Sequence, residues 1–412
     1  MVMLYANGHH DLYMQIIRLL GLDPWKYPFL DTDTVLSAVR CLRDGVDAYV
    51  ANPCDPGHRV YSYSPLWMLL TQLPVTLAWL TPIGMIVGIA FLLSLLLLPV
   101  GRDRYATMLI TLGAISSTAV YAVERGNNDL VIFVLAAAAA TLLSRSARAR
   151  LAGYSLIVLA GLLKYFPMLA MATALRERTG RFFVVTAASI AVTVLFSVLI
   201  WHDLSRALAS IPAGPFFGDM FGAITLGGGL TQLLDLPTWV VPVARLSLTL
   251  AALIIGIRLG LRKDTREALA RLNESERNFL LVGALLICGC FFTAQNIGYR
   301  GIHLLLMLPA FTVLCAAPVA QRLQRLVLVV LILLWIDFLR NLLMGFTFHT
   351  FDPMVPNGMM IATWAVREMI WWWFIPVLIS IITALLSKGP VVDLVFVRLR
   401  HRAKSGRQMP IS

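Results

Sequence analysis

Residues 81–100 read TPIGMIVGIAFLLSLLLLPV, a run of twenty residues without a charged side chain. An α-helix rises about 1.5 Å per residue, so a run of this length can cross the hydrocarbon core of a bilayer, which is about 30 Å thick. Its only side chains with a polar group are one Thr and one Ser. This stretch therefore predicts a transmembrane helix.

Eight further apolar runs of comparable length follow along the chain, and each predicts another crossing. The nine predicted spans are 81–100, 105–123, 129–144, 181–201, 238–258, 278–294, 302–319, 325–345 and 366–387. We therefore expect an all-α polytopic membrane protein. Its expected parts are an exoplasmic loop with juxtamembrane helices (1–80), a transmembrane bundle (81–387) and a basic cytoplasmic tail (388–412).

The composition agrees with a membrane protein. Hydrophobic residues make up 59% of the chain, charged residues make up 14%, and the mean hydropathy is +0.79. A water-soluble domain could not cover so much apolar surface. The net charge of +12 would suit nucleic-acid binding, but the Lys and Arg residues stand in short clusters between apolar runs. That placement follows the positive-inside rule, so no nucleic-acid partner is expected.

The basic clusters predict the orientation of the chain. They are 101–104, 144–150, 174–181, 257–277, 321–325 and 398–407. If all of them are cytoplasmic, as the positive-inside rule requires, the exoplasmic segments are 1–80, 124–128, 202–237, 295–301 and 346–365. We expect a multi-pass protein of the bacterial inner membrane, with any active site on the exoplasmic side.

Residues 151–173 conflict with this orientation if they form one span, because basic clusters flank them on both sides. Two shorter limbs that rise and return remove the conflict. Pro167 follows Lys164 closely, and Pro cannot continue a helical hydrogen-bond ladder. We therefore predict a re-entrant pair broken at 164–167, since broken helices are tolerated at membrane depth where they line a polar cavity.

The first 80 residues are harder to assign. Residues 1–30 contain no long apolar run, so either a first transmembrane helix is missing or the segment folds on the membrane surface. Residues 32–45 predict an amphipathic helix that lies on the bilayer, with capping candidates in 32–34 and Gly45 as its stop. Residues 64–80 predict a surface-lying or partly inserted helix interrupted by Pro74.

The five cysteines include no CxxC pair and no Cys/His cluster with zinc spacing, so no structural metal site is expected. Cys41 and Cys54 fall in the predicted exoplasmic region, where a disulfide would persist. Two unpaired thiols are the alternative.

Two carboxylates, Asp31 and Asp33, stand immediately before the amphipathic segment in PWKYPFLDTDT (24–34). A carboxylate just above a bilayer can act as a general base, or it can cap the helix that follows. Asp33 suits the cap better, which leaves Asp31 for catalysis.

The turn between the second and third predicted spans is unusually polar. A hairpin turn needs little more than a Gly and an Asn. The larger number of hydrogen-bonding side chains here therefore favours ligand binding over a purely structural turn. These candidate binding residues are Glu124, Arg125, Asn127, Asn128 and Asp129.

Two cations are further candidates because charges at membrane depth are costly. Lys164 stands at the predicted helix break, where it needs an anionic partner unless it reaches the interface along its alkyl chain. Arg300 stands on the predicted exoplasmic side, against the charge bias of the chain, and a guanidinium can bind phosphate through two parallel hydrogen bonds. Tyr299 and His303 flank it as additional binding candidates.

These motifs occur in an order that resembles the GT-C superfamily of integral-membrane glycosyltransferases. The resemblance rests on Asp31, Gly45-x-Asp-x-Tyr49, Tyr63-Ser-Pro-Leu-Trp67, Gly126-Asn-Asn-Asp129 and Leu163-Lys-Tyr-Phe-Pro167. The likeness is greatest to glycosyltransferase family 87, the polyprenyl-phosphate-mannose-dependent mannosyltransferase-like group, and covers about residues 31–175. The chain departs from the family pattern at Ser64 and at Asn127-Asn128-Asp129, which leaves the sugar unspecified.

The resemblance implies transfer of a mannose-like hexose from a polyprenyl-phosphate donor to a lipid-linked or glycan acceptor, with inversion. It implies Asp31 as the general base, and it adds Tyr63 and Trp67 to the binding candidates. Lys164 and Arg300 would stabilise the departing phosphate, so no metal and no other cofactor is expected. We expect Asp31 within about 10 Å of Lys164 or of residues 124–129, because base and cation must flank one anomeric carbon.

Two other interpretations remain. A transporter or flippase of a lipid-linked sugar also needs a polar path and cations for phosphate. A membrane protein with a degenerate site, kept for assembly with partners, is the third. Because the candidate residues concentrate on one predicted face of the membrane, an enzyme is favoured.

Overall fold

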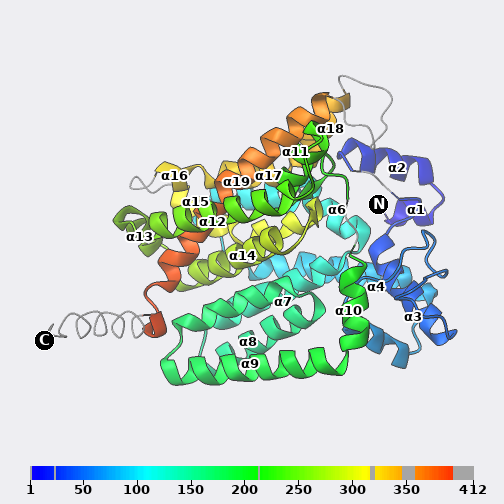
Figure 1. Cartoon of the computed structure of the whole chain (residues 1–412), viewed down its shortest axis with the longest axis horizontal. Helices are drawn as coiled ribbons and strands as arrows, with labels where there is room; N and C mark the ends of the chain where they lie inside the picture. Colours follow the sequence, from blue (N-terminus) through cyan, green and yellow to red (C-terminus); the bar gives the residue numbers. More distant parts are fainter. Residues whose placement is uncertain (1, 23–24, 212–213, 316–320, 346–357, 393–412) are drawn as a thin grey trace, which may run out of the picture.

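The computed structural model describes residues 2–22, 25–211, 214–315, 321–345 and 358–392 of the 412-residue chain. The described part is a helical bundle with one short two-stranded ribbon, as the sequence predicts (Figure 1). The ribbon pairs β1 (Met220–Phe221) with β2 (Asn296–Ile297) in antiparallel register. Most of the predicted tail (388–412), including its basic cluster at 398–407, and most of the predicted exoplasmic segment 346–365 lie outside the described residues.

Five segments are long and apolar enough to cross a membrane. They are Leu77–Leu97, which joins η2 (Leu77–Trp79), α4 (Leu80–Ser94) and η3 (Leu95–Leu97), together with α9 (Thr179–Leu199), α12 (Val240–Gly260), α14 (Glu274–Thr293) and α19 (Gly358–Leu386). These helices indicate a membrane protein.

Three bent pairs raise the number of candidate spans to eight if each pair is one crossing. The pairs are α5 (Arg104–Ala114) with α6 (Ser117–Arg125), bent by 42°, then η5 (Gly298–Leu306) with α15 (Leu308–Cys315), and α16–α17 (Gln321–Gln324, Leu326–Leu334) with α18 (Ile336–Gly345), each bent by 61°. Nine full spans are therefore not confirmed. The predicted span without a matching candidate is 129–144. It corresponds to α7 (Asn128–Leu143), whose 16 residues fall short of the usual crossing length of about 20.

The remaining elements are shorter and mostly connect or cover the spans. They are α1 (Val2–Ala6), α2 (His10–Leu19), α3 (Leu30–Arg43), η1 (Pro65–Gln72), α8 (Ala147–Leu163), η4 (Phe166–Arg176), α10 (Trp201–Ala209), α11 (Thr225–Leu234) and α13 (Lys263–Ala270). The predicted surface helix at 64–80 is thus divided. Its first half is η1, and its last residues already belong to the Leu77–Leu97 span.

Helix α14 lies in the middle of the bundle and α9 at its edge (Figure 1). Helix α12 is also mostly uncovered, since only 11% of its most apolar window is buried. In the most apolar window, 83% of α14 is buried but only 6% of α9. Two glycines let neighbouring backbone approach α14 closely, as small residues do in membrane bundles. A Cβ on Gly283 would lie 2.6 Å from a Met307 side-chain atom, and one on Gly289 would lie 2.8 Å from the Phe166 carbonyl oxygen. Both η4 and η5 therefore pack against this one helix.

The predicted break at 164–167 is confirmed. Lys164 ends α8 in an extended conformation (φ −148°, ψ 133°), and η4 begins at Phe166 with Pro167 in its first turn. Arg150, near the start of α8, binds Glu177, just after η4, with Nε 2.6 Å from Oε1. The two limbs therefore run in opposite directions and return to the same end of the bundle.

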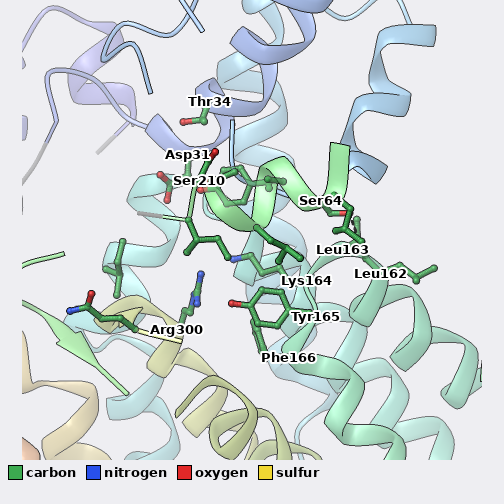
Figure 2. A pocket seen from close by; sticks show the side chains of 18 of the residues that line it. Asp31, Thr34, Ser64, Leu162, Leu163, Lys164, Tyr165, Phe166, Ser210 and Arg300 are labelled. Carbon is green, nitrogen blue, oxygen red and sulfur yellow. Dashed lines mark hydrogen bonds between the residues drawn. The ribbon is translucent and has the colours of Figure 1, made fainter. Parts of the chain in front are cut away.

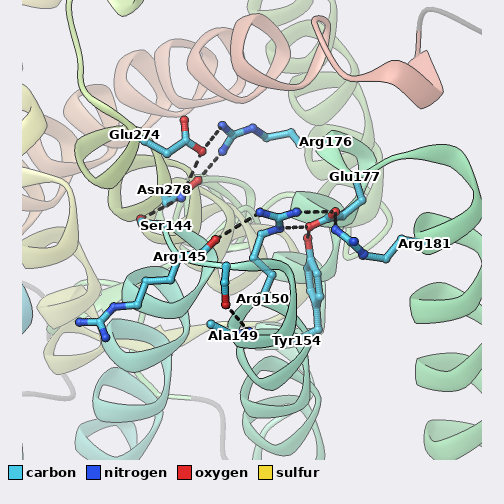
Figure 3. Close-up of polar contacts among 11 residues, drawn as sticks. Ser144, Arg145, Ala149, Arg150, Tyr154, Arg176, Glu177, Arg181, Glu274 and Asn278 are labelled. Carbon is cyan, nitrogen blue, oxygen red and sulfur yellow. Dashed lines mark hydrogen bonds and ion pairs between the residues drawn. The ribbon is translucent and has the colours of Figure 1, made fainter.

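Basic segments that are distant in sequence meet at that end (Figure 3). Arg102 binds Glu276, Arg322 binds Asp264, and Arg176 binds Glu274, with closest N–O distances of 2.7, 3.1 and 2.8 Å. Asn278 also donates to the Ser144 hydroxyl, 3.0 Å away. Five of the six predicted cytoplasmic clusters are joined in this way, so one orientation serves all five. The side of the membrane that they face stays a prediction.

The amphipathic helix predicted at 32–45 is α3, which starts two residues earlier, after Phe29 in the left-handed region (φ 70°). It ends before Gly45, whose φ of +80° suits the predicted stop. The helix does not lie exposed on a surface. Most of its residues are buried, because it packs against α4, α6 and η1.

The disulfide between Cys41 and Cys54 is present, with Cα atoms 5.7 Å apart. It ties α3 to the loop that leads into η1, around the aromatic side chains of Tyr49 and Tyr61. The other described cysteines, Cys288, Cys290 and Cys315, are unpaired.

We expect that replacing Cys41 and Cys54 by Ser lowers the free energy of unfolding by about 3 kcal/mol, the chain-entropy value for a loop of this length. Thermal unfolding in detergent measures the change, and Cys315→Ser is the matched control without an expected effect. Unfolded, unreduced protein should expose three reactive thiols and reduced protein five. Five thiols without reductant would show that the disulfide is absent.

We further expect equal accessibility for Arg148→Cys and Arg178→Cys, which flank the two limbs of the α8–η4 hairpin at the basic end. His202→Cys on α10, at the other end, should show the opposite accessibility. An impermeant thiol reagent applied to intact cells, in a Cys315→Ser background, measures all three. Opposite accessibility of positions 148 and 178 would mean that residues 151–173 cross the membrane once.

Candidate functional site

A cavity of about 610 Å³ lies at the end of the bundle opposite the basic clusters (Figure 2). Its walls come from α3, the loop before η1, the α8–η4 break, α9, α10 and the start of η5. Six predicted site residues line it: Asp31, Tyr63, Arg125, Lys164, Tyr299 and Arg300. Seven predicted site residues do not: Asp33, Trp67, Glu124, Asn127, Asn128, Asp129 and His303.

Asp31 lies in the first turn of α3 and is only 7% exposed. Its Oδ2 accepts a hydrogen bond from Asn127 Nδ2 at 2.6 Å, so the expected proximity to residues 124–129 is confirmed. The neighbouring Thr32 hydroxyl donates to the Gly126 carbonyl oxygen at 2.8 Å. Gly126 has φ +56°, and a Cβ there would lie 2.5 Å from the Thr32 hydroxyl oxygen, so this close docking requires glycine.

Asp33 does not cap α3, and it does not reach the cavity. Its carboxylate accepts hydrogen bonds from the Tyr27 hydroxyl and from the Ser37 hydroxyl, the latter at 2.9 Å. Burial and the hydrogen bond to Asp33 raise the pKa of Tyr27, which keeps that hydroxyl a donor. The cap prediction is therefore wrong, because the chain enters α3 through Phe29 in a left-handed conformation and no side chain caps the helix.

The polar turn at 124–129 mainly builds the wall behind the cavity. The Tyr13 hydroxyl donates to Glu124 at 2.5 Å, and the Asn127 side-chain oxygen caps α7 by accepting from the Asp129 backbone N–H at 2.7 Å. Asn128 is buried beside them. Only Arg125 faces the cavity, where its Nη2 donates to the Tyr121 hydroxyl at 2.9 Å. Asn127 contributes indirectly through its hydrogen bond to Asp31.

Asp129 is fully buried and lies between groups from two other segments, the α8–η4 break and η5. Lys164 Nζ is 2.7 Å from its Oδ2, Arg300 Nε is 3.4 Å from the same oxygen, and His303 Nε2 is 3.9 Å from Oδ1. The anionic partner predicted for Lys164 is therefore Asp129. Because one carboxylate serves two cations, this part of the cavity wall keeps a surplus positive charge.

Arg300 and Lys164 are also positioned by aromatic rings and a side-chain amide. Arg300 lies over the Phe166 ring, 5.9 Å from its centre, and Lys164 lies 5.7 Å from the centre of the Tyr63 ring. Asn296 accepts a hydrogen bond from Arg300 and donates to the Cys290 carbonyl oxygen at 2.5 Å. Such contacts orient a cation without neutralising it.

His303 and Trp67 pack against apolar side chains. His303 is completely buried and contacts the rings of Phe133 and Phe166, with ring centres 6.3 and 5.7 Å away. Trp67 is partly buried and packs against two hydrophobic clusters.

Arg59, which was not predicted from the sequence, also lines the cavity. It is held by Asp55, with Nη2 2.6 Å from Oδ1. Burial opposes ionisation of Asp55, but the hydrogen bonds from Arg59 outweigh it and lower the pKa of that carboxyl. The position of Arg59 on the predicted exoplasmic side could have identified it as a candidate, because the same argument identified Arg300.

Several uncharged polar side chains from separate elements complete the lining. They are Thr34, Ser62, Ser64, Tyr121, Tyr165, Thr193, Ser197, Ser210 and Gln295. Burial and the nearby Asp31 carboxylate raise the pKa of Tyr63, so its hydroxyl is protonated and can donate. The ionisable lining residues other than tyrosine are four cations and one carboxylate, Asp31. The cavity therefore favours an anionic ligand that carries hydroxyl groups.

An apolar groove of about 380 Å³ adjoins the cavity and shares Met168 and Thr193 with it. Its walls are η4, from Met168 to Leu175, and α9, from Phe182 to Val194. Because α9 is a peripheral span, the groove lies on the apolar side of the bundle.

No family model, curated protein or solved structure matches the chain. Among the described residues, no group of three or more His, Cys, Asp and Glu side chains is arranged to hold a metal ion.

We expect Asp129→Asn to destabilise the protein by about 3–5 kcal/mol, because it leaves Lys164 and Arg300 buried without their shared counter-charge. Lys164→Met should cost less than half as much, since Asp129 keeps Arg300 as a partner. Thermal unfolding in detergent compares the two variants. Equal losses would show that the carboxylate is not shared between the two cations.

Proposed function

We propose that the protein is an inverting membrane glycosyltransferase. It would transfer a hexose from a polyprenyl-phosphate donor to a lipid-linked or glycan acceptor, with Asp31 as general base. The observation that carries the proposal is the composition of one cavity wall. Asp31, the only acidic residue among the described lining residues, shares the cavity with Lys164 and Arg300, and an apolar groove adjoins the cavity.

The charges suit displacement of a phosphate from a sugar. Asp31 would accept the proton of the acceptor hydroxyl while that oxygen bonds to the anomeric carbon. The bond from the anomeric carbon to the phosphate oxygen breaks at the same time, and the electron pair leaves with the polyprenyl phosphate. Lys164 and Arg300 would stabilise the charge on this leaving group. Lys164 and Arg300 carry two positive charges and Asp129 only one negative charge, so one positive charge remains to attract the phosphate. A fully neutralised ion pair would attract a phosphate only weakly.

The apolar groove suits the polyprenyl chain of such a donor. It begins at Met168 and Thr193, on the cavity wall, and continues between η4 and α9 towards Leu175 and Phe182. A donor phosphate near Lys164 could therefore extend its chain along apolar side chains without crossing the polar part of the cavity. Burial of each additional CH₂ there would contribute about 0.8 kcal/mol.

The proposal places the chain with the GT-C glycosyltransferases and the family 87 group, on the resemblance of Asp31, the 126–129 turn and Lys164-x-x-Pro167. The two departures from the family pattern have structural roles in this chain. Ser64 donates to the Leu162 carbonyl oxygen at 2.7 Å and caps η1. Asn127 caps α7 and binds Asp31. Neither departure removes a charged group from the cavity.

We expect Asp31→Asn to lower turnover by about 10² or more, the usual loss when a general base is removed. The replacement can keep the hydrogen bond from Asn127, because its side-chain oxygen also accepts. Asp33→Asn is the matched control, since it changes the same charge two residues away. It should lower stability, through Tyr27 and Ser37, more than it lowers turnover.

The assay uses purified protein in detergent with polyprenyl-phosphate hexoses and a total lipid and glycan extract as the source of acceptors. Release of free polyprenyl phosphate reports transfer. Equal turnover of Asp31→Asn and the unmodified protein would remove Asp31 from the mechanism. Absence of release together with translocation of lipid-linked sugar in proteoliposomes would favour the transporter.

A further inference from the structure

A second polar pocket, of about 250 Å³, lies at the basic end of the bundle. Four cations line it: Arg176 at the end of η4, Arg266 on α13, Arg277 on α14 and Lys388 just after α19. The remaining lining residues are apolar or glycine: Leu269, Ala270, Ala384, Leu385 and Gly389. This pocket takes no part in the proposed sugar transfer.

The charge of this pocket is mostly uncompensated. Arg176 pairs with Glu274, with Nη2 2.8 Å from Oε1 (Figure 3). Arg277 donates to the carbonyl oxygens of Leu269 and Ala270 at 3.4 and 2.8 Å, which hold the guanidinium but do not neutralise it. Arg266 has no ion pair with any described residue, and its Nε is buried without a hydrogen-bond partner.

Lys388, the fourth cation, also has no ion pair within the described part of the chain. Four cations therefore face one carboxylate around the pocket. Other arginines at the same end are individually paired, such as Arg102 with Glu276 and Arg322 with Asp264. Exposed cations at this end, such as Arg148 and Arg271, also form no ion pair with a described residue, so what distinguishes the pocket is that four cations converge on one cavity.

The pocket is built by a close approach of two backbone segments. A Cβ on Gly389 would lie only 2.2 Å from the Leu175 carbonyl oxygen, so glycine is required where the end of α19 meets the end of η4. This contact brings Lys388 next to Arg176. The cations therefore converge because of the fold, from three regions of the sequence: the end of η4, the consecutive helices α13 and α14, and the end of α19.

The position of the pocket selects among anionic ligands. Ala384 and Leu385 belong to the last turn of α19, and Arg277 belongs to the first turn of α14, both of which are candidate spans. The cations therefore lie where apolar helices end, at the depth of phospholipid headgroups. Basic pockets between helices at this depth suit anionic headgroups, because guanidinium groups bind phosphate oxygens in parallel pairs.

We propose that this pocket binds the phosphate headgroup of an anionic phospholipid. The headgroup would bridge η4, α13, α14 and α19, with its acyl chains along the apolar helix surfaces. Since η4 leads back to Lys164 at the other end, a lipid bound here would also hold one limb of the hairpin that carries the cavity. The proposal does not depend on the chemistry assigned to that cavity.

Native mass spectrometry of the detergent-purified full chain with dioleoyl phosphatidylglycerol tests the proposal. We expect one tightly retained phosphatidylglycerol and at least about tenfold weaker retention of dioleoyl phosphatidylcholine. The Arg266→Gln/Lys388→Gln variant should lose about tenfold or more in phosphatidylglycerol affinity. Arg271→Gln is the matched control, because Arg271 is an exposed residue next to α13 that does not line the pocket.

A charge-preserving variant, Arg266→Lys/Lys388→Arg, should retain binding, which separates loss of charge from misfolding. Inorganic phosphate supplies the second arm of the experiment. Competition by inorganic phosphate at the same concentration as phosphatidylglycerol would overturn the proposal in favour of a soluble anion. Equal retention of the two phospholipids, or unchanged affinity in the Gln variant, would also overturn it.

Discussion

The buried carboxylate of Asp129 organises the whole candidate site. It binds Lys164 at 2.7 Å and lies 3.4 Å from Arg300, so it joins the α8–η4 break to the start of η5. Placing charged groups this deep is unfavourable unless they are paired, and one carboxylate can compensate only one of two cations. The arrangement therefore keeps the chain together and leaves a positive charge at the cavity wall. Stability and ligand attraction depend on the same three side chains.

The central helix α14 explains why these side chains meet. The η4 segment, which begins just after Lys164, and η5, which carries Arg300, both pack on α14, and Gly283 and Gly289 let them approach closely. The carboxylate side of the cavity is placed by a different contact, the docking of α3 on the Gly126 turn through Thr32. The cavity therefore forms where two independently positioned units face each other, and Asn127 connects them by binding Asp31.

Charge is distributed very differently at the two ends of the bundle. At the basic end, ion pairs such as that between Arg102 and Glu276 join segments that the positive-inside rule assigns to one side. At the other end, the cations that line the cavity are held by specific partners, as Arg59 is by Asp55 and Lys164 is by Asp129. Under the positive-inside rule, a basic cluster indicates the orientation of the chain. An isolated cation at the opposite end goes against that rule and therefore indicates a functional site. Arg59 shows that this second signal is easily overlooked in a loop.

The sequence by itself determined the helical membrane class, the approximate positions of the spans, and the helix break at 164–167, because hydrophobicity and the restrictions of proline are local properties. It also pointed to Asp31, Lys164 and Arg300, since unusual charges stand out against an apolar background. Only the tertiary structure decided which polar residues face the cavity. Asp33 and Asp129 are both carboxylates close to the predicted site, yet Asp33 binds its near neighbours Tyr27 and Ser37, whereas Asp129 binds Lys164 and lies beside Arg300 from distant parts of the chain. The partners of Asp129 could not be identified in advance, because which distant side chains converge on a buried carboxylate depends on long-range packing. Whether Asp33 binds its neighbours or reaches the cavity depends on how α3 packs, which the sequence does not specify.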